Sequence, residues 1–209
     1  MPTVASLPQE RMVLNHVSWE TYERLLEDHL DCSAPRFTYD HGVLEIMSPS
    51  PEHEWYNQLV SDLVKLLARE LRIDILSLGS TTFKQVSTKQ GFEPDSCFYV
   101  THIREVRGKH RLDMAVDPAR DVVVEVVVTH PSVSKFPICA ELRIPEIWTY
   151  DGSHLEMYQL RGSEYAETPF SRTLGGLKGT QLVEFLELAK TLDSLTWPDE
   201  VLNRFRHSS

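Results

Sequence analysis

The chain has 209 residues, a formal net charge of −10 at pH 7 and three cysteines without CxxC spacing. This length suffices to bury about 70% of the unfolded surface, so the chain can fold as one domain without disulfides or structural zinc. The negative charge counts against binding nucleic acid by overall charge alone, because that affinity comes mostly from lysine and arginine side chains.

The cysteine usage is typical of a reducing compartment, and we expect a cytoplasmic protein. No run reaches the ~20 apolar residues of a membrane span, and the amino terminus has no apolar core flanked by basic residues. Residues 1–15 are expected to form a flexible tail and residues 16–209 a single domain.

The first half of that domain shows three predicted elements. Ser18 is suited to cap a helix that begins directly after it. Residues 36–47 are typical of a hairpin that turns at His41-Gly42. Residues 53–71 keep an apolar rhythm of 3.6 residues, which predicts the longest helix, packed against a sheet.

The second half alternates less regularly. Strands are expected at residues 73–78 with a continuation to 86, at 94–100 and at 122–129. A helix over residues 132–143 leads to a strand at 146–150, which turns through Asp151-Gly152 into a strand at 155–160. A further edge strand is expected near Tyr165 and a closing helix over about residues 180–192.

These elements predict an α/β domain of the mixed α+β kind, built on a mixed sheet. Its core order is helix-strand-strand-strand-helix-strand, with a helix and hairpin added in front and a hairpin and helix added behind. Strict strand-helix alternation is missing, and the chain has no GxGxxG or GxxxxGK[ST] phosphate loop, which excludes the nucleotide-binding folds.

The most informative residue is Glu125, which stands among six valines in the segment DVVVEVVVTH. A strand of this composition is normally buried on both faces. A buried carboxylate needs a cation, a metal or a hydrogen-bond partner beside it. Asp95 begins the preceding predicted strand and Lys135 begins the following predicted helix, so neighbouring strands would let the two acids meet near a lysine.

Two converging acids and a lysine fit metal-assisted hydrolysis of a phosphate ester. Mg²⁺ takes oxygen ligands, usually one or two carboxylates with water and phosphate oxygens, and Mn²⁺ can substitute. Such a metal acidifies water and neutralises charge that develops on a phosphodiester. We expect Asp95 and Glu125 to be the metal ligands, and Lys135 to orient or deprotonate the water or to stabilise the phosphorus centre.

The order of these residues resembles the PD-(D/E)XK nuclease superfamily, whose core has the same helix-strand-strand-strand-helix-strand order. Within it, the chain resembles the Uma2 family of restriction endonuclease-like proteins, which is abundant in cyanobacteria. The resemblance runs over most of the chain and rests on residues 42–47 (GVLEIM) followed by Pro49 and His53, 91–95 (GFEPD), 123–125 (VVE), and Lys135 with 144–151 (IPEIWTYD).

The resemblance implies a restriction endonuclease-like fold, DNA as the polymer hydrolysed and Mg²⁺ as the cofactor. The superfamily motif places its lysine two residues after the second acid, where this chain has Val127. The family carries the lysine on the following helix, and counting back from residues 144–148 reaches Lys135. His53 matches the family's histidine, with Glu45 as a further auxiliary residue.

Several alternatives stay open. Glu125 can point outward from an edge strand, Asp95 can cap a turn, and Lys135 can be a solvated helix residue. The fold can also serve a catalytically inactive binding module, or a metal-dependent hydrolase of small phosphate esters. A homodimer is expected only by analogy with enzymes that cut both strands. A basic cluster is either a local patch or a solvated loop; it consists of Arg104, Arg107, Lys109 and Arg111.

Overall fold

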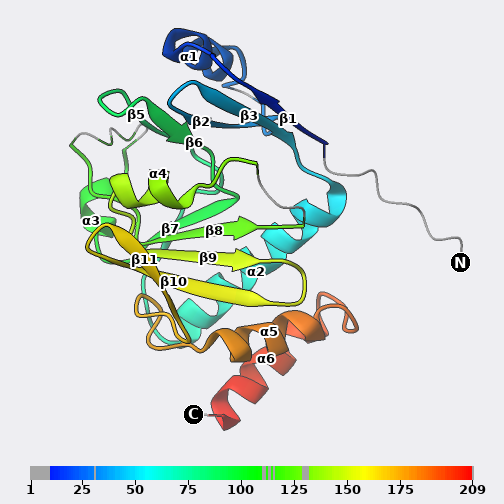
Figure 1. The fold of residues 1–209 in the computed structure, drawn as a ribbon. Coiled ribbons are helices and arrows are strands. Elements are labelled where there is room, and N and C mark those ends of the chain that lie inside the picture. Colours follow the sequence, from blue (N-terminus) through cyan, green and yellow to red (C-terminus); the bar gives the residue numbers. More distant parts are fainter. Residues whose placement is uncertain are drawn as a thin grey trace, which may run out of the picture.

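Two β-sheets organise the described residues, where the sequence predicted one mixed sheet. The computed structural model describes residues 10–30, 32–109, 112, 114, 116–128 and 132–208. The antiparallel sheet, at the top of Figure 1, has the strand order β1 (Glu10–Leu14), β3 (Val43–Ser48), β2 (Arg36–Asp40), β6 (Gln90–Phe92) and β5 (Phe83–Gln85). The mixed sheet below it has the order β11 (Glu164–Thr168), β10 (Leu155–Arg161), β9 (Glu146–Tyr150), β8 (Val122–Val126), β7 (Ser96–Tyr99) and β4 (Leu76–Ser77).

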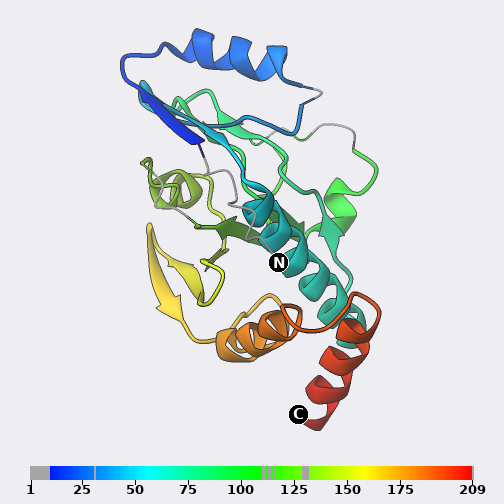
Figure 2. The ribbon, with the colours of Figure 1, turned by 90° about the vertical axis from the view of Figure 1, so that its right-hand side faces the viewer.

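Helices cover both sheets. They are α1 (Trp19–Asp28), α2 (Pro51–Glu70), α3 (Ile103–Val106), α4 (Phe136–Glu141), α5 (Gly179–Leu188) and α6 (Thr196–His207). Helix α1 packs on the antiparallel sheet, whereas α2 and α5 pack on one face of the mixed sheet and α4 on the other (Figures 1 and 2). None of the described helices is long and apolar enough to cross a membrane.

The local signals predicted several of these elements correctly. The Ser18 hydroxyl accepts a hydrogen bond from the backbone N–H of Thr21 at 3.1 Å, as expected for the cap of α1. Strands β2 and β3 form the expected hairpin around His41 and Gly42. The mixed α/β class and the order from α2 through β7 and β8 to α4 and β9 are also as predicted.

Other predictions were wrong in their bounds. Part of the expected tail, Glu10–Leu14, is strand β1 and pairs with β3. The strand expected over residues 73–86 is interrupted at Gly79, where φ is +58°, and its two halves lie in different sheets. Helix α4 begins only at Phe136, because Pro137 is tolerated only in the first turn of a helix.

The closing helix is also shorter than expected, and a further helix follows it. Helix α5 ends at Leu188, and α6 was not predicted. The side chain of Asp193 accepts hydrogen bonds from the backbone N–H groups of Leu195 and Thr196 at 2.9 Å each. These bonds satisfy amide groups at the new helix start, so one apolar stretch becomes two helices.

Strand β8 occupies the interior of the mixed sheet, between β7 and β9, and all of its residues are buried. Val122 and Val124 pack in the core beneath α2, whereas Val123 packs in the core beneath α4. This confirms the prediction of a strand buried on both faces. An outward-pointing Glu125 on an edge strand is therefore excluded.

The chain passes from the antiparallel sheet to the mixed sheet between β6 and β7, over residues 93–95. Strands β7 and β8 are antiparallel, with Ser96 opposite Val124 and Cys97 opposite Val123. Continuing this register by one residue places Asp95 opposite Glu125. The passage between the sheets thus brings the two acids of the predicted site together.

Gly91 in β6 lies against Tyr22 of α1, and we expect Gly91→Ala to lower the free energy of unfolding by about 1 to 3 kcal/mol. An added Cβ would overlap the Tyr22 hydroxyl and lie 2.9 Å from the backbone oxygen of Phe83. Urea unfolding measures the loss. The Tyr22 hydroxyl is buried without a hydrogen-bond partner, so Tyr22→Phe is a mild change that should recover part of it. If Gly91→Ala lowers the free energy of unfolding equally in the parent and in the Tyr22→Phe background, the steric explanation is wrong.

Candidate active site

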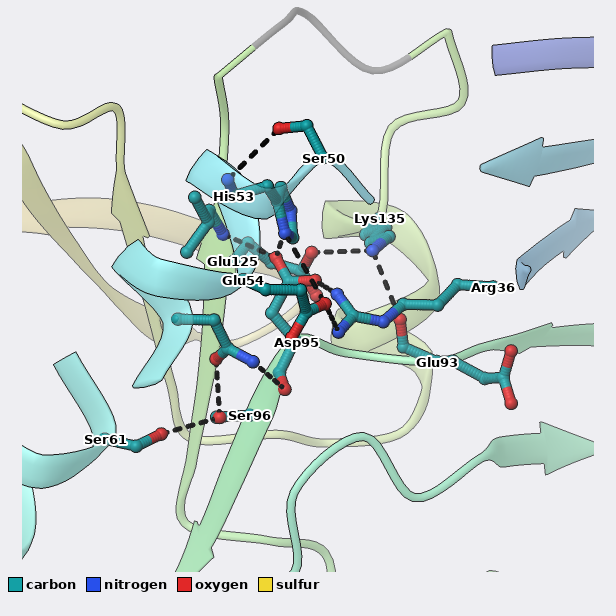
Figure 3. A network of polar contacts seen from close by, with 12 residues as sticks. Arg36, Ser50, His53, Glu54, Ser61, Glu93, Asp95, Ser96, Glu125 and Lys135 are labelled. Carbon is teal, nitrogen blue, oxygen red and sulfur yellow. Dashed lines mark hydrogen bonds and ion pairs between the residues drawn. The ribbon is translucent and has the colours of Figure 1, made fainter. Parts of the chain in front are cut away.

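The structure brings three of the predicted site residues into one buried cluster. Asp95 accepts a hydrogen bond from the backbone N–H of Val126 at 2.6 Å, which joins it to the strand of Glu125. The Lys135 ammonium lies 2.6 Å from Oε2 of Glu125, and it also reaches the backbone oxygen of Glu93 at 3.3 Å. Figure 3 shows these side chains converging between α2, the start of β7 and the start of α4. The lysine directly before α4 therefore reaches the acid of β8, although Thr129-His130 between them lies outside the described residues.

Glu125 is a buried carboxylate with one free oxygen. Its Oε2 is paired with Lys135, whereas Oε1 is buried and has no hydrogen-bond partner among the described residues. Burial raises the pKa of Glu125, and the nearby Lys135 charge opposes this rise. An additional positive charge at Oε1 would favour the ionised form.

Asp95 is paired with residues that the sequence did not single out. Its Oδ1 accepts a hydrogen bond from Nη1 of Arg36, which enters the cluster from β2 in the other sheet. Nη2 of the same guanidinium contacts Oε1 of Glu54 in the first turn of α2. Arg36 thus connects the most buried carboxylate of the cluster to a partly exposed one.

His53 lies at the same place and is uncharged at neutral pH. Its Nε2 is 3.2 Å from Oδ2 of Asp95, but neither ring nitrogen has hydrogen-bond geometry to a partner. Burial lowers the pKa of His53 to about 3, and the charges of Arg36 and Lys135 add to this effect. The predicted auxiliary histidine is therefore a neutral neighbour of Asp95 and adds no positive charge to the cluster.

Glu45, the other predicted auxiliary residue, lies at the rim of the cluster. It is buried in β3, where Oε1 pairs with Arg11 at 2.8 Å and Oε2 accepts the backbone N–H of Ser132 at 2.7 Å. The structure shows no direct contact between Glu45 and Asp95, Glu125 or Lys135 among the described residues. Glu45 holds the chain three residues before Lys135, so its contacts suit a positioning role.

A polar stripe on the buried face of α2 supports the backbone of Asp95. Asn57 donates a hydrogen bond to the backbone oxygen of Asp95 at 3.1 Å, and Ser96 donates one to Oδ1 of Asn57 at 2.7 Å. The Ser61 and Ser96 hydroxyls are 2.7 Å apart. His53, Asn57 and Ser61 follow one another at a spacing of four, and this polar stripe on an otherwise apolar face was the signal that could have revealed them.

The cluster contains more carboxylates than cationic side chains. Five carboxylates surround it, those of Glu45, Glu54, Glu93, Asp95 and Glu125, together with three cationic side chains, those of Arg11, Arg36 and Lys135. When all five acids are ionised, the sum is −2, which is the charge that one divalent cation balances. Burial raises the pKa of Glu93, and hydrogen bonds from the Phe37 backbone N–H and the Thr82 hydroxyl oppose this rise.

The donor set fits a hard divalent cation. Glu125 has a free buried oxygen, Asp95 lies opposite it, and carboxylate oxygens are the ligands that Mg²⁺ prefers. No group of three or more His, Cys, Asp or Glu side chains in the described part of the chain is arranged to hold a metal ion. Mg²⁺ needs fewer, since it commonly binds one or two carboxylates and completes its shell with water and phosphate oxygens.

The cluster is largely closed to solvent. Among its ionic side chains Glu54 is 39% exposed, compared with 11% for Lys135 and Glu125 and 1% for Asp95. Two surface hollows of about 590 and 520 Å³ lie elsewhere, one lined by residues of α2 and α6, the other by residues that include His41. The side of Glu54 is therefore the most accessible side of the cluster.

The basic cluster around α3 is not a free positive patch. Arg107 pairs with Asp74 at 2.8 Å, and Lys109 pairs with Asp117. Arg111 lies outside the described residues. The paired members agree with the solvated-loop interpretation of this segment.

Comparisons with known proteins identify a family and a similar fold. A family model described as "Putative restriction endonuclease", Uma2, matches residues 19–193. The fold is similar to the crystal structure of a protein from Anabaena variabilis, described as "a putative nuclease belonging to DUF820". The two chains share 14% sequence identity and a TM-score of 0.50, over 77% of this chain and 98% of the other. No curated protein sequence matches this chain.

Proposed function

The chain belongs to the Uma2 family of restriction endonuclease-like proteins, and we propose that it is a nuclease that hydrolyses phosphodiester bonds of DNA with Mg²⁺. Asp95 and Glu125 are the proposed metal ligands, and Lys135 is the proposed catalytic cation. The observation that carries the proposal is the free, buried Oε1 of Glu125. Glu125 lies beside Lys135, on strand β8, and β8 pairs with β7, the strand that Asp95 precedes.

Each of these residues has a role that follows from its contacts. A divalent cation held by two carboxylates supplies positive charge to a phosphodiester and acidifies water. Lys135 lies 2.6 Å from Glu125 and favours its ionised form, and it offers further N–H donors to a phosphate oxygen or to the attacking water. The backbone of Val126 and the side chain of Asn57 hold Asp95 in place.

Neutral His53 fills the space beside Asp95 without competing for its charge. A protonated imidazole there would add a further cation close to the acids and weaken their attraction for a metal ion. Its lowered pKa, about 3, keeps it neutral over the physiological range. We propose that His53 orients the Asp95 carboxylate, and that Glu45 orients the segment before Lys135.

Calorimetry with Mn²⁺ tests the metal site directly. The parent chain should take up about one Mn²⁺ ion, and Glu125→Gln should abolish the heat of binding, because the amide offers a neutral oxygen in place of a carboxylate. Glu146→Gln is the matched control. Glu146 is also buried, on the neighbouring strand β9, but its carboxylate is occupied by Trp148 and by backbone N–H groups.

Cleavage assays test the reaction and its substrate. The parent should cut DNA only when Mg²⁺ or Mn²⁺ is added, and single-stranded, double-stranded and branched DNA and RNA of matched sequence identify the preferred polymer. Uptake of Mn²⁺ without cleavage of any of them, combined with turnover of a small phosphate ester, would favour the small-substrate hydrolase instead.

A second candidate function is a catalytically inactive binding module. It is favoured by one observation: Arg36 and Lys135 already pair with both central carboxylates, so the cluster is stable as it stands. Absence of any Mn²⁺ heat in the parent chain, together with DNA binding that Asp95→Asn leaves unchanged, would support the module and exclude the nuclease.

A further inference from the structure

Arg36 lies where a metal ion would have to bind. Its guanidinium is on Oδ1 of Asp95, and its side chain is only 7% exposed. It comes from β2 of the antiparallel sheet, whereas the two proposed metal ligands belong to β8 and to the passage before β7 in the mixed sheet. Figure 3 shows the guanidinium between Asp95 and Glu54.

A guanidinium and a divalent cation cannot share this position at low cost. Oδ2 of Asp95 accepts the backbone N–H of Val126 and lies 3.2 Å from Nε2 of His53, so Oδ1 is the less crowded oxygen for a metal ion, and Arg36 contacts it. Two positive groups at one carboxylate oxygen also repel each other, and burial strengthens that repulsion because little solvent screens it. Metal binding must therefore weaken or break the pair between Arg36 and Asp95.

Glu54 provides the guanidinium with a second partner. It is paired with Nη2 of Arg36 and is the most exposed acid of the cluster. The Nε of Arg36 is buried without a hydrogen-bond partner, so the guanidinium is not fully satisfied where it lies. A small movement toward Glu54 would release Asp95 and keep the positive charge paired.

We propose that Arg36 is a built-in competitor of the metal ion for Asp95, and that Glu54 sets its strength by offering Arg36 an alternative carboxylate. Arg36 stabilises the metal-free site and makes metal binding conditional on its displacement. Arg36 is thus a positioning residue for Asp95. This inference rests on the proposed function, since it takes Asp95 as a metal ligand.

The two partners of the pair should change metal affinity in opposite directions. Arg36→Gln should lower the Kd for Mn²⁺ by about 10- to 100-fold, the common range of coupling between two binding events, because the competitor is gone. Glu54→Gln should raise the Kd by a smaller factor, because Arg36 then has only Asp95 to pair with. Isothermal calorimetry on the full chain, without substrate, measures both.

Two control variants isolate the effect from charge alone. Lys84→Gln removes the same charge from the same sheet, but the pair it breaks is the solvent-exposed one with Glu23, so it should change the Kd by less than about threefold. Glu52→Gln removes an acid from the same helix turn as Glu54 and should behave likewise. A Lys84→Gln effect as large as that of Arg36→Gln would overturn the proposal.

A double variant decides whether Glu54 acts through Arg36. In the Arg36→Gln background, Glu54→Gln should leave the Kd unchanged within about twofold, since the group it acts on is absent. A Glu54→Gln effect of the same size in both backgrounds would make Glu54 a simple attracting charge or a ligand, and would overturn the proposed coupling.

Folding is followed on the same samples by circular dichroism and thermal unfolding without metal. If Arg36→Gln does not fold, Arg36→Lys replaces it, because one ammonium cannot span both carboxylates as a guanidinium does, and its Kd should lie below that of the parent. If the parent binds Mn²⁺ and the Arg36 variant binds it no more tightly, this inference is wrong while the proposed function stands. Failure of the parent and of all variants to bind Mn²⁺ overturns the proposed function as well.

Discussion

Asp95→Asn is expected to lower metal-dependent cleavage by about 10³-fold or more. The amide keeps the shape of the side chain but removes the negative charge that would hold the metal ion, and transition-state stabilisation by such a metal amounts to several kcal/mol. Single-turnover cleavage of DNA at saturating Mg²⁺ measures the loss. Retention of more than a tenth of the parent rate would contradict the assignment of Asp95.

The control for this experiment is another buried aspartate on the same pair of strands. Asp121 lies just before β8, at the opposite end from Glu125, and accepts backbone N–H groups of Val100 and Thr101 at 2.7 and 2.9 Å. Asp121→Asn should lower stability but keep the cleavage rate of the folded protein. Loss of activity in both variants to the same extent would indicate damage to the fold and not to the site.

Lys135→Met is expected to reduce cleavage by about 10²- to 10⁴-fold, the usual contribution of a positioned group in proton transfer. The variant keeps the length of the side chain and removes the ammonium that lies 2.6 Å from Glu125. It also leaves Glu125 buried without its cation, so the carboxyl group should take up a proton more readily. We therefore expect weaker Mn²⁺ binding together with the loss of rate.

A surface lysine provides the matched control. Lys84 pairs with Glu23 at 2.8 Å in a solvent-exposed position, where such a pair contributes little to stability. Lys84→Met removes the same charge and should change neither rate nor metal affinity. Cleavage that survives Lys135→Met at the parent rate would exclude Lys135 from the chemistry and leave the two carboxylates as the proposed site.

The acids of the cluster could be found from local sequence because they break a pattern. Glu125 interrupts a run of valines, and a charge in a strand buried on both faces signals a partner or a metal. Pro94-Asp95 marks the start of a strand. Strands β7 and β8 are antiparallel neighbours, and their register places Asp95 opposite Glu125. Lys135 was assigned through the resemblance to the Uma2 family, by counting back from the strand after α4.

Arg36 and Glu54 could not be found in this way. Arg36 begins an ordinary hairpin strand, and Glu54 is one of two acids in the first turn of α2, where acids are common because of the helix dipole. Each has a function in the cluster only because the antiparallel sheet lies against the start of α2. That contact joins residues 18 and 59 positions apart, which no local pattern encodes.

Local sequence by itself predicted the class of the fold, most of the elements and the two acids of the candidate site, and the resemblance to the Uma2 family added the role of Lys135. Apolar periodicity, capping residues and prolines act within a few neighbours, so they can be interpreted without coordinates. The tertiary structure alone decided that two sheets meet at the cluster and which cation each carboxylate contacts. Electrostatic pairing between buried groups depends on distance in space and on exclusion of water, and both are set only when segments far apart in the chain pack together.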